Sequence, residues 1–266
     1  MIYLSGLLPR KHPEFYRHFK KLLDTIGVTY LLLESTKDIW CRDYMPIINK
    51  GDMVSFKYTP PYLKKQKHLR TITKNVNTPG VTKFIESDLI IDGGNIVLCE
   101  GVLICTDAIF GWNPNYPKDT IIKTLKVVLK LKKVIVIPSY PGDIFRHADG
   151  VVKFLDEKHV FVVDDRVYKG GYTRCVVKKL KKHGINPIMV PYVDFEIEYN
   201  DSFTARGNYI NVLETDTHLI IPAYGLKEDN DAVILYEKHY PNKVVVSINC
   251  NGIADEGGVL NCITWN

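Results

Sequence analysis

Apolar residues along the chain follow two recurring patterns, one typical of strands and one of amphipathic helices. Short apolar and β-branched runs such as 95–99 and 102–105 flank tight polar turns and predict β-hairpins. Apolar residues at helical spacing follow the hairpins, and each helix precedes another apolar run typical of a buried strand. The hairpin turns are expected near residues 51–52, 100–101, 156–157 and 214–215. Helices are expected over 14–26, 118–131, 171–183 and 227–239, with a less regular one over 63–76, and the strands after them over 28–33, 134–137, 187–190 and 244–248.

The unit of strand, turn, strand, helix and strand recurs at a nearly constant interval. Successive hairpin turns lie between about 49 and 58 residues apart, which gives about five units in 266 residues. Units of this size stack or close into a ring, so that each covers the apolar face of its neighbour. The chain begins inside a unit, so the strand at residues 1–4 is expected to join the C-terminal segment and close the ring. The pattern therefore predicts an α/β propeller that is a single domain over residues 1–266, with an open α/β sheet carrying hairpin insertions as the alternative.

Composition and charge narrow the classes of function. The fractions of hydrophobic residues, 45%, and of charged residues, 24%, are those of an ordinary globular protein. The net charge of +5 comes largely from lysines at 123–133 and 178–182, interleaved with Leu and Val as on solvated helix faces, so no nucleic-acid partner is expected. The opening apolar residues are too few for a membrane span and lack the features of a signal peptide, which predicts a cytoplasmic protein with no membrane partner.

The six cysteines form no C-x-x-C pair and have no His-x-x-x-His partner. Neither a zinc site nor a redox dithiol is therefore indicated, and no metal or cofactor is expected. A homo-oligomer is compatible with the sequence.

The unusual polar residues lie at the same place in every unit, just before the first hairpin strand. These segments are 40–43 (WCRD), 92–95 (DGGN), 147–150 (HADG), 206–208 (RGN) and 257–262 (GGVLNC). If the units surround an axis, equivalent positions converge on it. We therefore expect a pocket that brings together several acids, a histidine and a cysteine.

This set of side chains suits a guanidinium substrate. A guanidinium is a planar permanent cation whose N–H donors two carboxylates can bind from opposite edges, and Asp43 and Asp149 are the candidates. Its central carbon is a poor electrophile, so the reaction needs a strong nucleophile, for which Cys262 is the candidate. His147 could protonate the departing nitrogen and then activate water, with Asp92 fixing its tautomer. A thiolate beside an imidazolium also predicts a lowered pKa for Cys262.

Four ordered motifs resemble a known family. The segments WCRDYMP at 40–46, DGGN at 92–95, HAD at 147–149 and GGVLNCIT at 257–264 resemble the signature segments of the agmatine deiminase and bacterial peptidyl-arginine deiminase group of the guanidine-modifying pentein superfamily. The resemblance implies a five-bladed αββαβ propeller. It also implies metal-free hydrolysis of a small guanidine to a ureido product and ammonia through an S-alkylthiouronium on the cysteine.

The family roles are carried over by motif. The resemblance assigns the nucleophile to Cys262, the acid/base to His147, guanidinium binding to Asp43 and Asp149, and orientation of the histidine to Asp92, where many relatives have Glu. Three departures leave the substrate open among agmatine, free arginine and peptidyl arginine. Relatives usually have His at the position of Asn261 and often Gly at that of Arg146, and the chain is shorter than typical agmatine deiminases.

For other residues near the motifs the sequence allows two roles each. Trp40 either packs in the core or lines the alkyl stem of the substrate. Arg206, like Arg146, either recognises a substrate carboxylate or lies on the surface. Arg42 either pairs with a site carboxylate or, as we expect, braces a neighbouring blade.

Two alternative functions share most of these residues. An amidinotransferase would use the same cysteine, histidine and acids but pass the amidino group to an amine. A non-enzymatic pentein, similar to the propeller that blocks ribosomal subunit joining, is supported only by the positive charge and leaves the cysteine, histidine and acids without a use.

Overall fold

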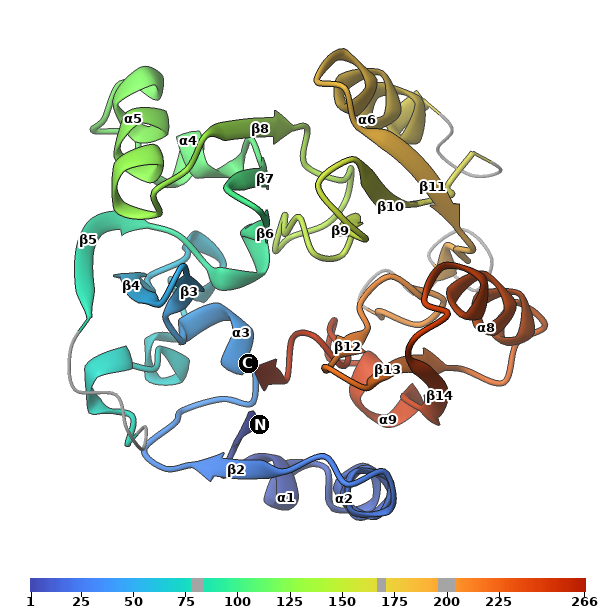
Figure 1. Ribbon diagram of the computed structural model, residues 1–266. Helices are drawn as coiled ribbons and strands as arrows, with labels where there is room; N and C mark the ends of the chain where they lie inside the picture. The colour runs from blue at the N-terminus through green and yellow to red at the C-terminus, as the bar shows by residue number, and fades with distance from the viewer. Residues whose placement is uncertain (78–83, 167–170, 196–203) are drawn as a thin grey trace.

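The strands of the protein form five three-stranded sheets around a central axis. The computed structural model describes residues 1–77, 84–166, 171–195 and 204–266, and the sheets are arranged in these ranges as the blades of a ring (Figure 1). In every blade the strand nearest the axis is antiparallel to the middle strand, which is parallel to the outer strand. The predicted five-unit propeller is confirmed.

From the axis outward, the strands of the five blades are β15 (Thr264–Trp265), β1 (Ile2–Ser5) and β2 (Tyr30–Leu33); β3 (Ile47–Asn49), β4 (Asp52–Lys57) and β5 (Ile85–Ile90); β6 (Val97–Cys99), β7 (Val102–Thr106) and β8 (Lys133–Ile137); β9 (Val152–Phe154), β10 (His159–Val163) and β11 (Asn186–Val190); β12 (Leu213–Glu214), β13 (His218–Ala223) and β14 (Val244–Asn249). The α-helices are α1 (Leu8–Lys11), α2 (Pro13–Thr25), α3 (Cys41–Tyr44), α4 (Ala108–Trp112), α5 (Lys118–Val128), α6 (Gly171–Lys182), α8 (Glu228–His239) and α9 (Asn251–Ala254). The 3-10 helices are η1 (Pro61–Leu63), η2 (Lys67–Leu69), η3 (Thr73–Asn75) and η4 (Gly93–Asn95).

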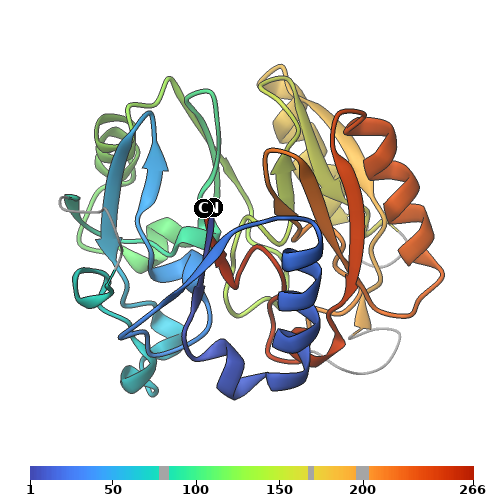
Figure 2. The same cartoon turned by 60° about the horizontal axis from the view of Figure 1, so that its bottom comes forward.

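The two ends of the chain close the ring. Strand β15 pairs with β1 in an antiparallel register that sets Tyr3 opposite Trp265 and Leu4 opposite Thr264. The indole of Trp265 also donates to the carbonyl oxygen of Pro46, 2.7 Å away, which ties this blade to the next. Both termini accordingly lie side by side near the axis (Figures 1 and 2). The predicted pairing of residues 1–4 with the C-terminal segment is confirmed.

Two hairpins have the tight turn that their sequence favours. Lys50 and Gly51 have φ values of 50° and 80°, and Glu100 and Gly101 have 46° and 81°. Positive φ at both central positions matches the right-handed twist of the flanking strands, and glycine adopts it without steric cost. The first turn therefore centres one residue earlier than expected, while the second lies where it was predicted.

The outer helices cover the sheets with one apolar face each. In α2 the buried side chains Phe15, Phe19 and Leu23 repeat every four residues, and in α5 Ile121 and Leu125 do the same. The middle strands β7, β10 and β13 are buried along nearly their whole length because helices and neighbouring blades cover both of their faces.

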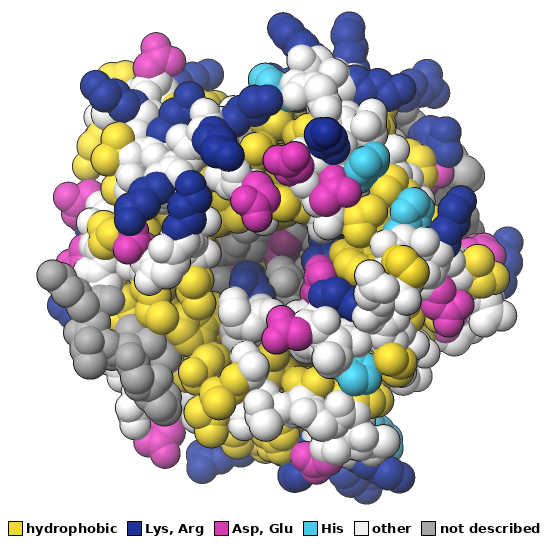
Figure 3. All heavy atoms as spheres, in the orientation of Figure 1, with side chains coloured by type: hydrophobic (Ala, Val, Ile, Leu, Met, Phe, Trp, Pro, Cys, Tyr) yellow, Lys and Arg dark blue, Asp and Glu magenta, His cyan; other side chains and the backbone are white. Residues whose placement is uncertain are grey.

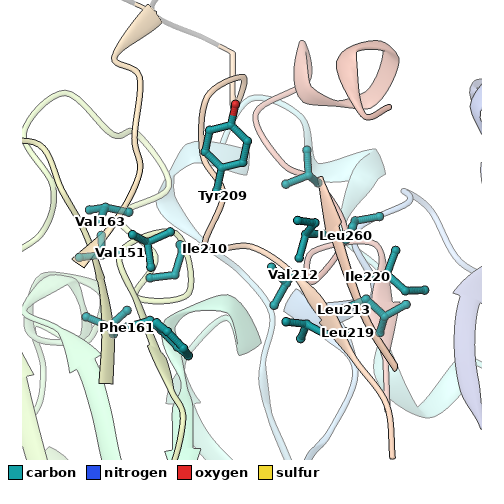
Figure 4. Close-up of a cluster of buried hydrophobic side chains, with 14 of the residues drawn as sticks. Val151, Phe161, Val163, Tyr209, Ile210, Val212, Leu213, Leu219, Ile220 and Leu260 are labelled. Atoms are coloured by element: carbon teal, nitrogen blue, oxygen red, sulfur yellow. The ribbon is translucent and has the colours of Figure 1, made fainter. Parts of the chain in front are cut away.

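Much of the core lies between neighbouring blades. Figure 4 shows Phe161 of β10 and Leu219 of β13 within one cluster, joined by Ile210 and Val212 from the segment between these blades. Each of these four side chains is at most 2% exposed. Burial between blades explains why single units would not be stable alone.

The predicted helix over residues 63–76 is wrong. The region instead has three short 3-10 turns, η1 to η3. Its buried residues are Leu63, Thr71, Thr73 and Val76, a spacing that marks no single helix face. None of the helices in the described ranges has both the length and the apolarity required to cross a membrane.

Candidate active site

The motif segments lie where the chain approaches each inner strand. Helix α3 leads into β3, η4 leads into β6, and residues 147–149 lead into β9. Residues 208–211 precede β12, and Cys262 precedes β15. Because the inner strands surround the axis, these five approaches meet near the centre of the ring (Figure 1).

His147 lies between two carboxylates. Its Nε2 is 3.1 Å from Oδ2 of Asp92, and its Nδ1 is 3.6 Å from Oδ1 of Asp43. Asp92 is fully buried, while His147 and Asp43 are at most 8% exposed. Both ring nitrogens therefore face an acid, an arrangement that favours the imidazolium form.

Gly94 lets the backbone pass close to this pair. Its N–H donates to Oδ1 of Asp43 at 3.0 Å, and its carbonyl oxygen accepts from the N–H of Asp149 at 3.0 Å. A Cβ at this position would lie 2.5 Å from Nδ1 of His147 and 2.7 Å from Oδ1 of Asp43. No side chain fits there without displacing the imidazole or the carboxylate.

For the guanidine hydrolysis that the sequence predicts, a Gly94→Ala variant is therefore expected to lose about 100-fold in kcat/KM. The reason is that displacements near 1 Å disrupt the alignment of reacting groups. Steady-state kinetics measures this loss. Gly111→Ala is the control, since a Cβ at Gly111 meets nothing within 4 Å. Unchanged kinetics of Gly94→Ala would contradict the placement of His147 in the reaction.

Asp149 connects the acid cluster to the cysteine. Its Oδ2 lies 3.9 Å from Sγ of Cys262 and accepts a hydrogen bond of 2.7 Å from Nδ2 of Asn261. The backbone N–H groups of Asn261 and Cys262 both donate to Oδ1 of Asn211, at 3.0 and 3.3 Å. The nucleophile candidate is thus held beside a buried carboxylate.

One cavity is lined by three of the predicted site residues. It has a volume of about 160 Å³, and its lining includes His147, Asp149 and Cys262. Asp143 and Asp194 also belong to its lining. Cys262, His147, Asp43, Asp92 and Asp149 are therefore brought together as the sequence predicted, with the first two in a shared cavity.

Burial and mutual repulsion set the protonation of the site. Burial opposes the imidazolium of His147, but Asp43 and Asp92 outweigh it and raise the pKa of His147 to about 10. Burial raises the pKa of Asp43 to about 8 despite the nearby imidazolium. Burial also raises the pKa of Asp149, against His147 and the hydrogen bond from Asn261.

The predicted lowering of the Cys262 pKa is wrong for this site. Burial, followed by the charges of Asp149 and Asp43, raises the pKa of the Cys262 thiol well above its ordinary value. The acids that suit a cationic substrate repel a thiolate, so the free site favours the neutral thiol.

Two further predicted residues lie near the cavity in different ways. The Trp40 ring packs against Gly258, where an added Cβ would lie 2.6 Å from its Cζ3 and 3.1 Å from Cβ of Cys262. It is partly buried against the main core and is absent from the described lining of the cavity. Arg206 does line the cavity, but its Nη2 lies 2.8 Å from Oδ2 of Asp255. Recognition of a substrate by either residue stays a prediction.

Tyr62 lies at the site but was not predicted from the sequence. Its hydroxyl donates to Oδ2 of Asp92 at 2.5 Å, and its ring lies edge-on to His147 with centroids 6.1 Å apart. Trp112 and Phe145 also pack near the imidazole, at 6.2 and 6.0 Å between centroids. Tyr62 lies in η1, just before the stretch predicted as a helix and outside the motif segments, so no motif pointed to it.

The sequence profile of the Porphyromonas-type peptidyl-arginine deiminase family matches residues 8–266. The chain belongs to this family. It is 24% identical over 274 residues to the agmatine deiminase of Pseudomonas aeruginosa, an alignment that covers 86% of this chain and 74% of that protein. The predicted family, the class of guanidine-hydrolysing enzyme that it implies and the hydrolase assignment are confirmed.

Solved structures share the fold of this family member. The agmatine deiminase of C. jejuni superposes with a TM-score of 0.80 at 20% identity, covering 100% of this chain and 92% of that chain. A DDAH from Pseudomonas aeruginosa in complex with citrulline gives a TM-score of 0.57 at 12% identity, covering 95% and 86%. The pentein fold is thereby confirmed.

Proposed function

We propose that this family member hydrolyses agmatine to its ureido product and ammonia, with Cys262 as nucleophile and His147 as acid and base. The observation that carries the proposal is the shared cavity, in which the cysteine and the histidine lie beside the buried carboxylate of Asp149. Asp43 and Asp149 bind the guanidinium from two sides. Asp92 holds the imidazole in place.

Substrate binding activates the nucleophile. In the free site, burial and the acids keep Cys262 protonated. A guanidinium bound between Asp43 and Asp149 supplies the positive charge that offsets these acids, so the pKa of the thiol falls and its proton leaves to solvent. The substrate cation therefore produces the thiolate that attacks its own central carbon.

His147 acts twice in the two half-reactions. As an imidazolium it donates its proton to the departing nitrogen, and the C–N bond breaks to release ammonia and leave an amidino group on Sγ of Cys262. The neutral imidazole then removes a proton from water, which attacks the same carbon. The adduct then loses its hydroxyl proton to solvent as the C–S bond breaks, which releases the ureido product and restores the thiolate. The thiolate takes up a proton from solvent when the product leaves.

Acidic residues in the lining of the cavity favour a substrate with a second cation. Asp143 and Asp194 both line the cavity, and the Tyr140 hydroxyl donates to Oδ2 of Asp194 at 3.3 Å. Arg206, the candidate for binding a carboxylate, is paired with Asp255. An aminoalkyl tail therefore meets complementary charge, whereas an α-carboxylate meets two acids.

We expect kcat/KM for agmatine to exceed that for free arginine and for C-terminal arginine peptides by about 10-fold or more, which corresponds to about 1.4 kcal/mol. Ureido colorimetry and ammonia release measure the turnover. A preference for arginine would overturn the choice of substrate, and no turnover of any guanidine would overturn the proposed function.

Alkylation of Cys262 is expected to be slow at neutral pH when the reagent is neutral. Because the pKa of the thiol is raised, labelling by iodoacetamide should increase about 10-fold per pH unit through the alkaline range. The cationic reagent 2-chloroacetamidine should label Cys262 faster at pH 7, since it brings the positive charge that the acids bind. Mass spectrometry of the labelled peptides measures both rates, with the exposed Cys175 as internal reference. Rapid labelling of Cys262 by iodoacetamide at pH 7 would contradict the raised pKa of its thiol.

A further inference from the structure

The segment that carries Cys262 is held by Arg42, through both its backbone and its side chain. The backbone N–H of Arg42 donates to the carbonyl oxygen of Cys262 at 3.1 Å. Its guanidinium continues along the same segment, with Nε donating to the carbonyl oxygen of Asn261 at 3.4 Å and Nη2 to Oδ1 of Asn266 at 2.8 Å. One residue thus contacts three positions of the C-terminal segment.

Arg42 is itself held close to the residues that bind the substrate. It belongs to α3, whose next residue is Asp43. The helix packs so tightly on η4 that a Cβ at Gly93 would lie only 1.8 Å from the carbonyl oxygen of Arg42. Gly94, the next residue of η4, donates to Asp43. Arg42, which holds the Cys262 segment, and Asp43, the proposed guanidinium ligand, are therefore fixed relative to each other.

The opposite side of the nucleophile segment is held from a different blade. Oδ1 of Asn211 accepts the N–H groups of Asn261 and Cys262, while Arg42 donates to the carbonyl oxygens of the same two residues. The peptide groups around Cys262 are therefore held from both sides. Because Arg42 acts on the carbonyl oxygens, it determines the orientation of the backbone from which Sγ projects.

We propose that Arg42 is a positioning residue that aligns Sγ of Cys262 with the guanidinium held by Asp43 and Asp149. The inference rests on the proposed function for its kinetic consequence, while its geometric part concerns the cysteine alone. Since the contacts exist before any substrate binds, Arg42 acts on alignment for attack and so on kcat more than on KM.

The effect of the Arg42 hydrogen bonds can be separated from the effect of its positive charge. Arg42 borders a second cavity of about 390 Å³ whose lining includes Asp149 and Asn261. Its positive charge opposes the burial that raises the pKa of Asp149. Lysine keeps this charge but has neither the Nε–H donor nor the planar fork. Arg42→Lys therefore removes the guanidinium hydrogen bonds to Asn261 and Asn266. It keeps the backbone hydrogen bond to Cys262 and most of the electrostatic effect.

The test compares Arg42→Lys and Arg42→Met with Arg166→Gln, which breaks an exposed ion pair to Asp164 outside the site. For each protein we would measure the thermal midpoint, kcat and KM for agmatine, and the pH dependence of Cys262 alkylation by 2-chloroacetamidine. Arg42→Lys is expected to lower kcat and the alkylation rate constant together by about 10- to 100-fold, with KM within about threefold of the parent. Arg166→Gln should change none of these.

Each other outcome overturns the inference. A lowered thermal midpoint with unchanged kcat and alkylation of the folded protein would make Arg42 a purely structural brace. A rise in KM alone would make it an aid to substrate binding. If the parent protein turns over no guanidine, the proposed function fails, but the alkylation rates of folded Arg42→Lys and parent still decide whether Arg42 aligns the cysteine. Arg42→Met serves to show whether charge adds to the effect and is not needed for that decision.

Discussion

A Cys262→Ala variant is expected to lose guanidine turnover by at least about 10⁴-fold, since removal of a covalent nucleophile leaves only binding and electrostatic effects. The substitution removes the sulfur that lies 3.9 Å from Oδ2 of Asp149 and opens a small space beside the cavity. It leaves in place Asp43 and Asp149, the acids that we propose bind the guanidinium. Agmatine should therefore still bind, and calorimetry should detect it.

The control for this substitution is Cys175→Ala, which changes an exposed cysteine of α6. It should keep the activity of the parent protein. In the parent, rapid acid quench during turnover followed by mass spectrometry should show an amidino adduct on the peptide that contains Cys262. Turnover by Cys262→Ala above a hundredth of the parent rate would show that the reaction proceeds without this nucleophile.

Much of the ring could be predicted because each unit repeats the same local rules. The hairpin turn at Glu100 and Gly101 needs positive φ at both positions, and the sequence supplies glycine at the second. The regular spacing of the motifs then required the β1 and β15 strands to meet, as the pairing of Tyr3 with Trp265 shows. Closure followed from the number of units rather than from any single residue.

The features that could not be predicted depend on the path of the chain between repeats. Tyr62 reaches Asp92 because the segment after β4 turns back in short 3-10 steps, which no periodicity encodes. Arg206 pairs with Asp255, 49 residues away, a contact that depends on how α9 is placed. Motif position indicated that Arg206 lies near the centre but not which partner its side chain takes, and it gave no indication for Tyr62.

The sign of the Cys262 pKa shift depended on magnitudes that the sequence does not contain. An imidazolium was expected to stabilise the thiolate, but its charge is already matched by Asp43 and Asp92, on either side of His147. What remains at the sulfur is burial and the charges of Asp149 and Asp43, which together raise the pKa of the thiol. The predicted residues do meet at this site, whereas the balance of charge among them required their distances and burial.

An Asp149→Asn variant is expected to lower kcat/KM for agmatine by about 30- to 4,000-fold, the equivalent of about 2–5 kcal/mol for removing one partner of a buried charge pair. The amide has half of the acceptor capacity of the carboxylate and no charge. Its NH₂ group would also face donors, since Asn261 already donates to Oδ2 of Asp149. Steady-state kinetics measures the loss, and Asp164→Asn, at an exposed ion pair with Arg166, is the control.

The same variant should change the reactivity of Cys262 in the opposite direction. After burial, Asp149 is the main cause of the raised pKa of the thiol, so its removal lowers that pKa. Labelling of Cys262 by neutral iodoacetamide at pH 8 should therefore become faster in Asp149→Asn while turnover becomes slower. General damage to the site would slow both turnover and labelling. Faster labelling with slower turnover is expected only if the Asp149 carboxylate binds the substrate cation and also disfavours the thiolate of the free enzyme. A fall in both rates would show that Asp149 acts mainly by holding the structure of the site together.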